Sequence, residues 1–297
     1  MKTIFELVKL VLDDLYKETK NEHSGDESAT DKEIKEQIEY LADNYKKLTD
    51  KNSPGINYKK PATRFAYVYK YVASHADYIF QLLENLELKN PDKFEPIKSI
   101  FLKDILKISC IGGGPGSDIV GLLKYLLSLD KQKVSRVTCY LCDKEQAWAD
   151  SWTEIDNKTS LKEIILNTNF QPLDVTDSTS WQYQKKFLDS DIFTLSYFVS
   201  EVSRLDKEDL ENFWDTIFTK SKTGSAFIFI DNAHTDFTTY FDNKWSEKGM
   251  KVISSADATV TPSSNEQLSV FGEYLTKFPN KPKLRSQISF RLLIKEQ

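Results

Sequence analysis

A short apolar stretch that runs directly into a glycine-rich loop most constrains how this 297-residue chain can fold. Residues 106–111 are predicted to form a buried strand, the loop Gly112-Gly113-Gly114-Pro115-Gly116 follows, and residues 117–129 show helical periodicity. Glycines suit such a turn because its backbone adopts angles that are costly for other residues and must approach a ligand closely. The order strand, glycine loop, helix therefore predicts a nucleotide-like ligand beside the helix N-terminus.

Strands and helices alternate after this loop. Strands are predicted at 134–142, 168–173, 191–199 and 225–230, and helices at 144–152 and 206–221. Such units specify a parallel sheet with helices on both faces. Residues 270–278 and 286–295 instead predict two strands joined by a turn too short for a crossover helix, so they must pair antiparallel. We expect an α/β fold, with a Rossmann-like, mostly parallel seven-stranded sheet that ends in a C-terminal antiparallel hairpin.

The chain is expected to divide into a helical N-terminal cap region, residues 1–98, and an α/β domain, residues 99–297. An apolar face over residues 4–15 predicts a first helix. A polar stretch over 21–33 predicts an exposed loop, with Thr30 or Asp31 capping a second helix that ends near Leu48.

Beyond the break predicted at Ser53-Pro54-Gly55, Pro61 is placed to begin a helix over residues 61–86. One face of this helix carries Arg64, Tyr67, Tyr71 and His75. Two interpretations of that face stay open: a half-buried seam whose polar tips reach water, or a helix laid over a ligand pocket.

The charge of the chain bears on whether its partner is a nucleic acid. Acidic residues number 45 against 40 basic residues, a net charge of −5, so no overall positive field attracts nucleic acid. A nucleic-acid substrate would need a local basic patch, and the richest candidates are Lys59-Lys60 and the tail residues Lys277, Lys281, Lys283 and Arg285.

The cysteines and the apolar stretches bear on the compartment. Cys139 and Cys142 form a C-x-x-C, but no second pair stands at metal-ligand spacing, so we predict no metal site. Three cysteines in a chain of this length do not make a disulfide framework, which fits a reducing compartment. No stretch approaches the ~20 apolar residues of a membrane span, and the first residues do not resemble a signal peptide. We expect a cytoplasmic protein, with a nuclear or nucleolar location as the alternative.

The glycine spacing distinguishes between nucleotide ligands. A dinucleotide fingerprint would require Gly or Ala at position 117, where Ser117 stands, and no P-loop lysine follows. Glycines at 112, 114 and 116 instead resemble motif I of class I S-adenosylmethionine-dependent methyltransferases, and the resemblance covers roughly residues 100–295. It implies S-adenosylmethionine as cofactor, held by Gly112, Gly113, Gly114, Gly116 and Asp118. Cys110 departs from the family, which often has an acid there.

The resemblance also implies cofactor contacts at the ends of later strands. Asp143 stands where the family's acid takes the ribose hydroxyls, and Asp174 with Val175 where the adenine lies. Ser196 would lie beside the methionine end, where Arg64, Tyr67 or Tyr71 would take over the role of the missing acid. Asp143 as a helix cap and Asp174 as a turn cap remain the structural alternatives.

Candidate catalytic residues follow the fourth and fifth strands. Tyr197 and Glu201 are candidates to orient the acceptor or take its proton, and His234 is a candidate base. Each also has a plain interpretation as pocket wall, cap or solvated loop. No cysteine lies on or after the fourth strand, which excludes a covalent thiolate route and leaves direct in-line transfer to an N or O acceptor.

The leading hypothesis is therefore an S-adenosylmethionine-dependent methyltransferase whose acceptor is RNA or a small molecule. The helical first third and the segment 110–122 are loosely similar to fungal ribosomal-RNA uridine N3-methyltransferase-like proteins. The alternative, kept open by Cys110, is a non-catalytic S-adenosylmethionine-binding regulatory or scaffold protein with a methyltransferase fold.

Overall fold

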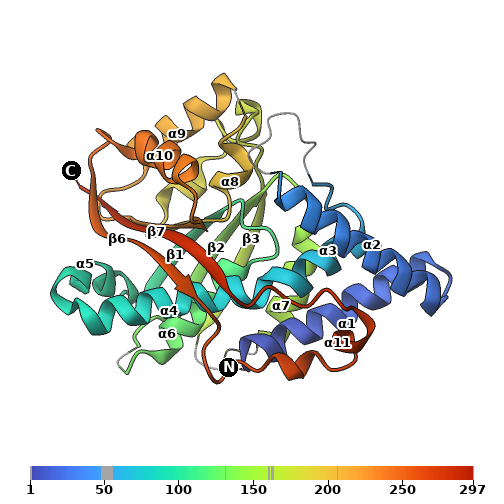
Figure 1. Cartoon of the computed structure of the whole chain (residues 1–297). Helices are drawn as coiled ribbons and strands as arrows, with labels where there is room; N and C mark the ends of the chain where they lie inside the picture. The colour runs from blue at the N-terminus through green and yellow to red at the C-terminus, as the bar shows by residue number, and fades with distance from the viewer. Residues whose placement is uncertain are drawn as a thin grey trace.

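A seven-stranded sheet forms the centre of the computed structural model, which describes residues 2–47, 56–130, 132–159, 161, 164–205 and 207–296 (Figure 1). The strand order is β3-β2-β1-β4-β5-β7-β6. The strands are β1 Ile105–Ile111, β2 Arg136–Asp143, β3 Ile165–Pro172, β4 Ile192–Ser196, β5 Ala226–Asn232, β6 Met250–Val260 and β7 Ser286–Lys295. β1 to β5 pair parallel, whereas β7 runs antiparallel to both β5 and β6. The predicted α/β fold class is confirmed.

The antiparallel pair uses a different first strand from the one predicted. Residues 270–278 are not a strand; this stretch overlaps the 3₁₀ turn η4 (Leu268–Phe271) and contains the short helix α11 (Tyr274–Lys277). Gly272, at φ 53°, interrupts the stretch, and Phe271, Tyr274 and Phe278 recur at helical spacing and are all buried. The partner of β7 is β6, an edge strand on which no position is fully buried and whose apolar pattern is therefore weak.

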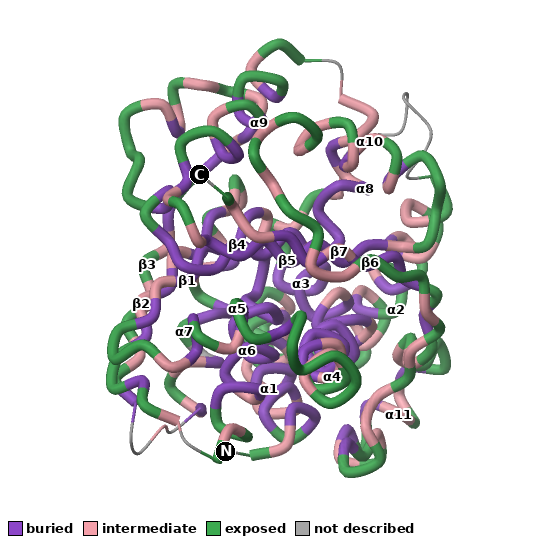
Figure 2. The backbone as a smooth tube through the Cα atoms, turned by 90° about the vertical axis from the view of Figure 1, so that its left-hand side faces the viewer, coloured by how far each residue is buried: buried purple, intermediate pink, exposed green. Residues whose placement is uncertain are grey.

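Helices cover both faces of the sheet, as Figures 1 and 2 show. α1 Ile4–Glu22, α4 Ala73–Lys89, α6 Ser117–Ser128 and α7 Trp148–Thr159 lie on one face, with α2 Glu27–Tyr45, α3 Pro61–Tyr67 and α5 Pro91–Phe101 on the same side. α8 Val199–Val202, α9 Glu208–Lys220 and α10 Thr235–Trp245 lie on the other, with the 3₁₀ turns η2 Ser178–Ser180 and η3 Lys185–Asp189 in the connection before β4. None of the helices in the described ranges is long and apolar enough to cross a membrane.

Side-chain alternation along the strands divides the core into two layers. In β5, Ile228 and Ile230 pack with the N-terminal helices, whereas Phe227 and Phe229 pack with α9 and α10. The first layer contains buried residues of both α1 and β1, so the helical cap region and the sheet share one continuous core. Burial of each such side chain contributes about 1.5–3 kcal/mol.

The second helix begins earlier than predicted. α2 starts at Glu27, because Asp26 accepts hydrogen bonds from the N–H groups of Ser28 (2.8 Å) and Ala29 (3.1 Å). The predicted cap at Thr30 or Asp31 is wrong, and most of the predicted loop 21–33 is helical. The predicted helix end at Leu48 and the break at Ser53-Pro54-Gly55 lie outside the described residues.

The predicted helix 61–86 is present but contains a π-helical turn. α3 continues into the turn η1 (Val68–Val72) and then into α4, which ends at Lys89. Such turns are rare and occur frequently at functional sites. Tyr67, Tyr71 and His75 follow one another along this stretch, with ring centroids 5.5 Å and 5.6 Å apart.

Candidate functional site

The glycine loop connects β1 to α6 in a conformation that ordinary residues avoid. Gly112, Gly114 and Gly116 have φ values of 62°, 49° and 86°. A Cβ atom on Gly112 would lie 2.3 Å from Phe198 Cδ2, and one on Gly116 would lie 2.2 Å from Trp152 Cε3. Gly114 differs, because the nearest atom to its Cβ position belongs to Trp148 at 3.9 Å. Space is therefore left open in front of Gly114 alone among these three glycines.

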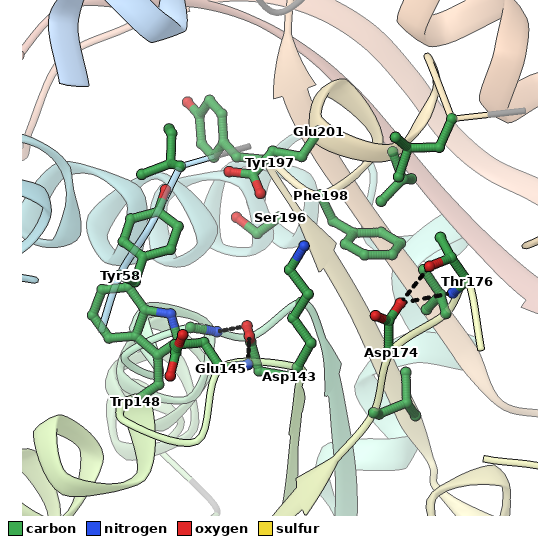
Figure 3. A pocket seen from close by; sticks show the side chains of 18 of the residues that line it. Tyr58, Asp143, Glu145, Trp148, Asp174, Thr176, Ser196, Tyr197, Phe198 and Glu201 are labelled. Atoms are coloured by element: carbon green, nitrogen blue, oxygen red, sulfur yellow. Dashed lines mark hydrogen bonds between the residues drawn. The ribbon is translucent and has the colours of Figure 1, made fainter. Parts of the chain in front are cut away.

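Hydrogen bonds hold this loop against the end of β2 (Figure 3). The N–H groups of Gly112 and Gly113 donate to the carbonyl of Cys142 at 2.9 Å and 3.2 Å. Asp143 accepts from Gly114 N through Oδ2 and from Glu145 N through Oδ1, both at 2.9 Å. Burial raises the pKa of Asp143, and these two N–H groups oppose that shift. Asp143 is not a helix cap, since the next helix begins at Trp148.

A cavity of about 360 Å³ opens at the carboxyl ends of β1 to β4. It is lined by Asn44, Ile56, Tyr58, Tyr67, Gly112, Gly114, Asp143, Lys144, Glu145, Trp148, Leu173, Asp174, Val175, Thr176, Ser196, Tyr197, Phe198, Glu201, Val202, Arg204, Leu205 and Lys207. The structure thus brings together nine of the residues singled out in the sequence: Tyr67, Gly112, Gly114, Asp143, Asp174, Val175, Ser196, Tyr197 and Glu201. We call this space the donor-side cavity.

Asp174 is held at the end of β3 by a turn. Its Oδ1 accepts hydrogen bonds from Thr176 N at 2.9 Å and Thr176 Oγ1 at 2.7 Å (Figure 3). The expected turn-capping contact is therefore present, and Asp174 also lines the donor-side cavity. The two interpretations of this residue are compatible, because a carboxylate has lone pairs for both.

Other predicted contacts lie away from this cavity. Gly113 and Gly116 pack inside the loop, and Asp118 is buried beneath it, where Thr194 Oγ1 donates to Asp118 Oδ2 at 2.5 Å. Burial raises the pKa of Asp118 to about 6. Arg64 is only 2% exposed and pairs with Glu18 Oε1 at 2.8 Å, so its side chain supports the fold rather than lining the cavity.

Glu201 lies where the short helix α8 faces the cavity. Its Oε1 accepts from Tyr45 Oη at 3.4 Å, and Tyr45 Oη lies 3.1 Å from Tyr58 Oη. Burial raises the pKa of Glu201 to about 7, and the negative charge of Asp143 adds to the shift. A carboxyl group with a pKa near neutrality can accept a proton from a substrate.

Tyr197 follows β4 in the left-handed region, at φ 54°, which is uncommon for a residue with a side chain. Its N–H donates to Ile230 O at 2.7 Å, and its ring stacks on His75 with centroids 3.7 Å apart and an interplanar angle of 11°. These contacts hold the strained turn in place.

His234 does not line the donor-side cavity. It is the N-cap of α10, where Nδ1 accepts from Asp236 N at 3.3 Å, and half of its side chain is exposed. Tyr71 likewise lies outside the donor-side cavity; with His75, His234 and Tyr197 it lines a second cavity.

Aromatic residues that the sequence did not single out form one wall of the donor-side cavity. The rings of Tyr58 and Trp148 have centroids 4.9 Å apart, and Tyr67 lies 5.5 Å from each of them. Trp148 falls within the helix predicted at 144–152, but nothing in the local pattern marks it as pocket-lining. Within the described ranges, no group of His, Cys, Asp and Glu is suited to hold a metal ion.

The comparisons with known proteins found similarity to solved structures but not to sequences. No family model matches the chain, and no curated protein matches it. Among solved structures, a proposed RNA methyltransferase from Pyrococcus horikoshii is 13% identical, with 88% of this chain and 99% of that chain covered and a TM-score of 0.43. The CurJ carbon methyltransferase is 11% identical, with 95% and 71% covered and a TM-score of 0.44. The precorrin-6y C5,15-methyltransferase of Geobacter metallireducens is 12% identical, with 70% and 89% covered and a TM-score of 0.40.

The sheet order of this chain, with β7 reversed between β5 and β6, is a mostly parallel seven-stranded arrangement, as predicted from the sequence. The comparisons lend no support to the likeness to fungal uridine N3-methyltransferases.

Two alanine substitutions in the glycine loop should separate backbone strain from packing. Gly114→Ala should cost about 1 kcal/mol of the free energy of unfolding, because only its positive φ is unfavourable. Gly116→Ala should cost about 1–3 kcal/mol more, because its Cβ would overlap the ring of Trp152. Urea unfolding followed by tryptophan fluorescence measures both. Equal losses would mean that the loop packs differently from the structure.

Glu201 should make the stability of the protein depend on pH. Its pKa is about 7 in the folded protein against 4.5 for an ordinary glutamate, so its stabilising contribution is complete below pH 4.5 and is lost as the pH rises through 7. Glu201→Gln cannot ionise, and we expect this variant to be more stable than the unmodified protein at pH 8 but not at pH 5. Thermal unfolding at the two pH values tests this, and a pH-independent difference would contradict the assigned pKa.

Proposed function

We propose that this protein is an S-adenosylmethionine-dependent methyltransferase that transfers a methyl group by direct in-line displacement to an N or O acceptor. One observation carries the proposal. The donor-side cavity lies at the carboxyl ends of the parallel strands, and Gly114, Asp143 and Asp174 meet there from the ends of three neighbouring strands.

The cavity residues fit the proposed methyl donor. Gly114 leaves room for a ligand to approach the backbone, and Asp143 presents a carboxylate that can accept hydrogen bonds from two ribose hydroxyls. Asp174 and Val175 would face the adenine, and Ser196 and Tyr67 the methionine end. Arg64 has no place in this contact set, because its guanidinium pairs with Glu18.

The residues that follow β4 are proposed to serve the acceptor. The bound donor supplies an electrophilic methyl group; a lone pair of the acceptor bonds to its carbon while the carbon–sulfur bond breaks. Glu201, with a pKa of about 7, would take the proton that the acceptor nitrogen or oxygen loses. Tyr197, held by its stacking on His75, would position the acceptor. His234 lies outside the donor-side cavity and receives no role in the transfer.

Binding of S-adenosylhomocysteine should depend on Asp143. We expect Asp143→Ala to weaken binding by about 1.5–3 kcal/mol, because hydrogen bonds from the ligand to a charged group are lost. Isothermal titration calorimetry measures the change, with NAD titrated in parallel. Asp150→Ala, on the exposed side of α7, is the matched control and should bind normally.

Two further variants protect this experiment from misinterpretation. Asp143→Asn keeps the shape of the side chain and one acceptor oxygen, but its NH2 group would face the N–H of either Gly114 or Glu145. The melting temperature without ligand is therefore measured for both Asp143 variants, and only a loss of affinity larger than the loss of stability counts in favour of the proposal. Gly114→Val should block binding by placing a branched side chain in the open space. Unchanged affinity in the Asp143 variants would remove the main support for the proposal. Binding without methyl transfer to any acceptor would favour the non-catalytic regulatory or scaffold role.

A further inference from the structure

A second cavity, of about 670 Å³, shares Tyr197 with the donor-side cavity. It is lined by Tyr45, Lys46, Tyr71, His75, Tyr197, Asn232, Ala233, His234, Phe237, Lys283, Arg285, Ser286 and Gln287. Tyr197 lines both cavities, and Tyr45 reaches Glu201 in the donor-side cavity through its hydroxyl. We call this space the second cavity.

The charge of the second cavity is opposite to that of the protein as a whole. The residues that line it include Lys46, Lys283 and Arg285 but no aspartate or glutamate, although the chain has a net charge of −5. Lys46 pairs with Asp43 at 3.1 Å. Lys283 and Arg285 have no ion-pair partner among the described residues, so their positive charge is not neutralised within the described part of the protein.

Most other cations of the two basic segments have partners. Lys277 pairs with Glu27 at 2.6 Å, Lys60 pairs with Glu33 at 3.2 Å, and the Lys281 side chain donates to the carbonyl of Leu275. Among the described residues of these segments, Lys283, Arg285 and the exposed Lys59 have no ion-pair partner, and of these three only Lys283 and Arg285 line the second cavity.

The backbone that carries these two cations is fixed. Lys283 N donates to Lys70 O at 2.9 Å, Ser74 Oγ donates to Lys283 O at 2.9 Å, and Tyr78 Oη donates to Leu284 O at 2.6 Å. This segment is thus fastened to η1 and α4. A cation on a fixed backbone loses less conformational freedom when it binds a ligand.

Aromatic rings also line the second cavity. Tyr71 stacks on His75, and His75 stacks on Tyr197, with interplanar angles of 26° and 11°. Burial, together with the charge of Lys283, lowers the pKa of His75 to about 3, so this imidazole is neutral and adds no charge of its own. Flat rings beside unpaired cations suit a ligand that has both a planar apolar part and an anionic group.

We propose that the second cavity is the acceptor site, and that the acceptor is a small planar molecule with a phosphate or carboxylate group bound by Lys283 and Arg285. This rests on the proposed methyltransferase function. The anionic group would lie at the cations, and the nucleophilic end would face Tyr197, the residue that both cavities share. A structured RNA is disfavoured, because duplex binding neutralises many phosphates and only two unpaired cations are present here.

Titration calorimetry of the full chain with three probes tests the proposal. Phenyl phosphate and benzoate carry the two anionic groups, and benzyl alcohol is the neutral comparison. We expect at least one anionic probe to bind about tenfold or more tightly than benzyl alcohol, as hydrogen bonds to a charged group imply. The tighter of the two anions identifies the group that the site prefers. In Lys283→Gln/Arg285→Gln, the affinity for that probe should fall by about tenfold or more.

Two controls make the result decisive. Lys251→Gln removes a cation near the opposite end of the β6–β7 pair, where Lys251 faces Ile294, and should bind the probes normally. S-adenosylhomocysteine is titrated into the same samples, and its affinity should be unchanged in the double variant.

Normal binding of the anions by the double variant, or no preference for an anion over benzyl alcohol, would overturn the proposal. So would tight, steeply salt-dependent binding of an RNA oligonucleotide. Anion binding that depends on Lys283 and Arg285 without any binding of S-adenosylhomocysteine would leave the anion site standing and refute the methyltransferase proposal instead.

Discussion

The hydrogen bonds that hold the glycine loop against the end of β2 are the contacts on which the candidate site depends. Gly112 and Gly113 bind the carbonyl of Cys142, and Gly114 binds the carboxylate of Asp143. Together they join the ends of two parallel strands, leave the face of Gly114 open and orient a buried carboxylate toward the same space. A ligand that needs both close approach to a backbone and a bidentate acceptor finds them side by side at the ends of the neighbouring strands β1 and β2.

Tyr197 lines two cavities that differ in charge. Acids and cations both line the donor-side cavity, namely Asp143, Glu145, Asp174 and Glu201 with Lys144, Arg204 and Lys207, whereas the second cavity is lined by cations and by no acid. Burial and mutual repulsion raise the pKa of Glu201 toward neutrality on the donor side, which suits the acceptance of a proton. The strained backbone of Tyr197 and its stacking on His75 fix the position of this residue, which lines both cavities.

The sequence predicted the parallel part of the sheet well, because β1, β2, β4 and β5 carry apolar runs whose residues are largely buried. The sequence-based predictions failed where the apolar pattern is ambiguous or where a side chain's position depends on tertiary packing. The stretch 270–278 is rich in apolar and aromatic residues, as strands are, yet the three- and four-residue spacing of Phe271, Tyr274 and Phe278 packs it as helical turns. The edge strand β6 gives only a weak apolar signal. Arg64 shares a helix face with Tyr67, but its long side chain pairs with Glu18 of α1. This contact depends on how α1 packs against α3, which the local sequence does not indicate. Nothing local to Trp148 or Lys283 indicates a cavity, because each reaches one through elements distant in sequence.

A crystal structure of the protein with bound S-adenosylhomocysteine tests the central claim most directly. We predict that the ligand lies in the donor-side cavity, with its ribose hydroxyls hydrogen-bonded to the carboxylate of Asp143 and its adenine beside Asp174 and Val175. The ligand should also contact the protein backbone at Gly114. The sulfur should face the side of the cavity formed by Tyr197 and Glu201. Density for the ligand elsewhere, or a ribose that does not contact Asp143, would contradict the account.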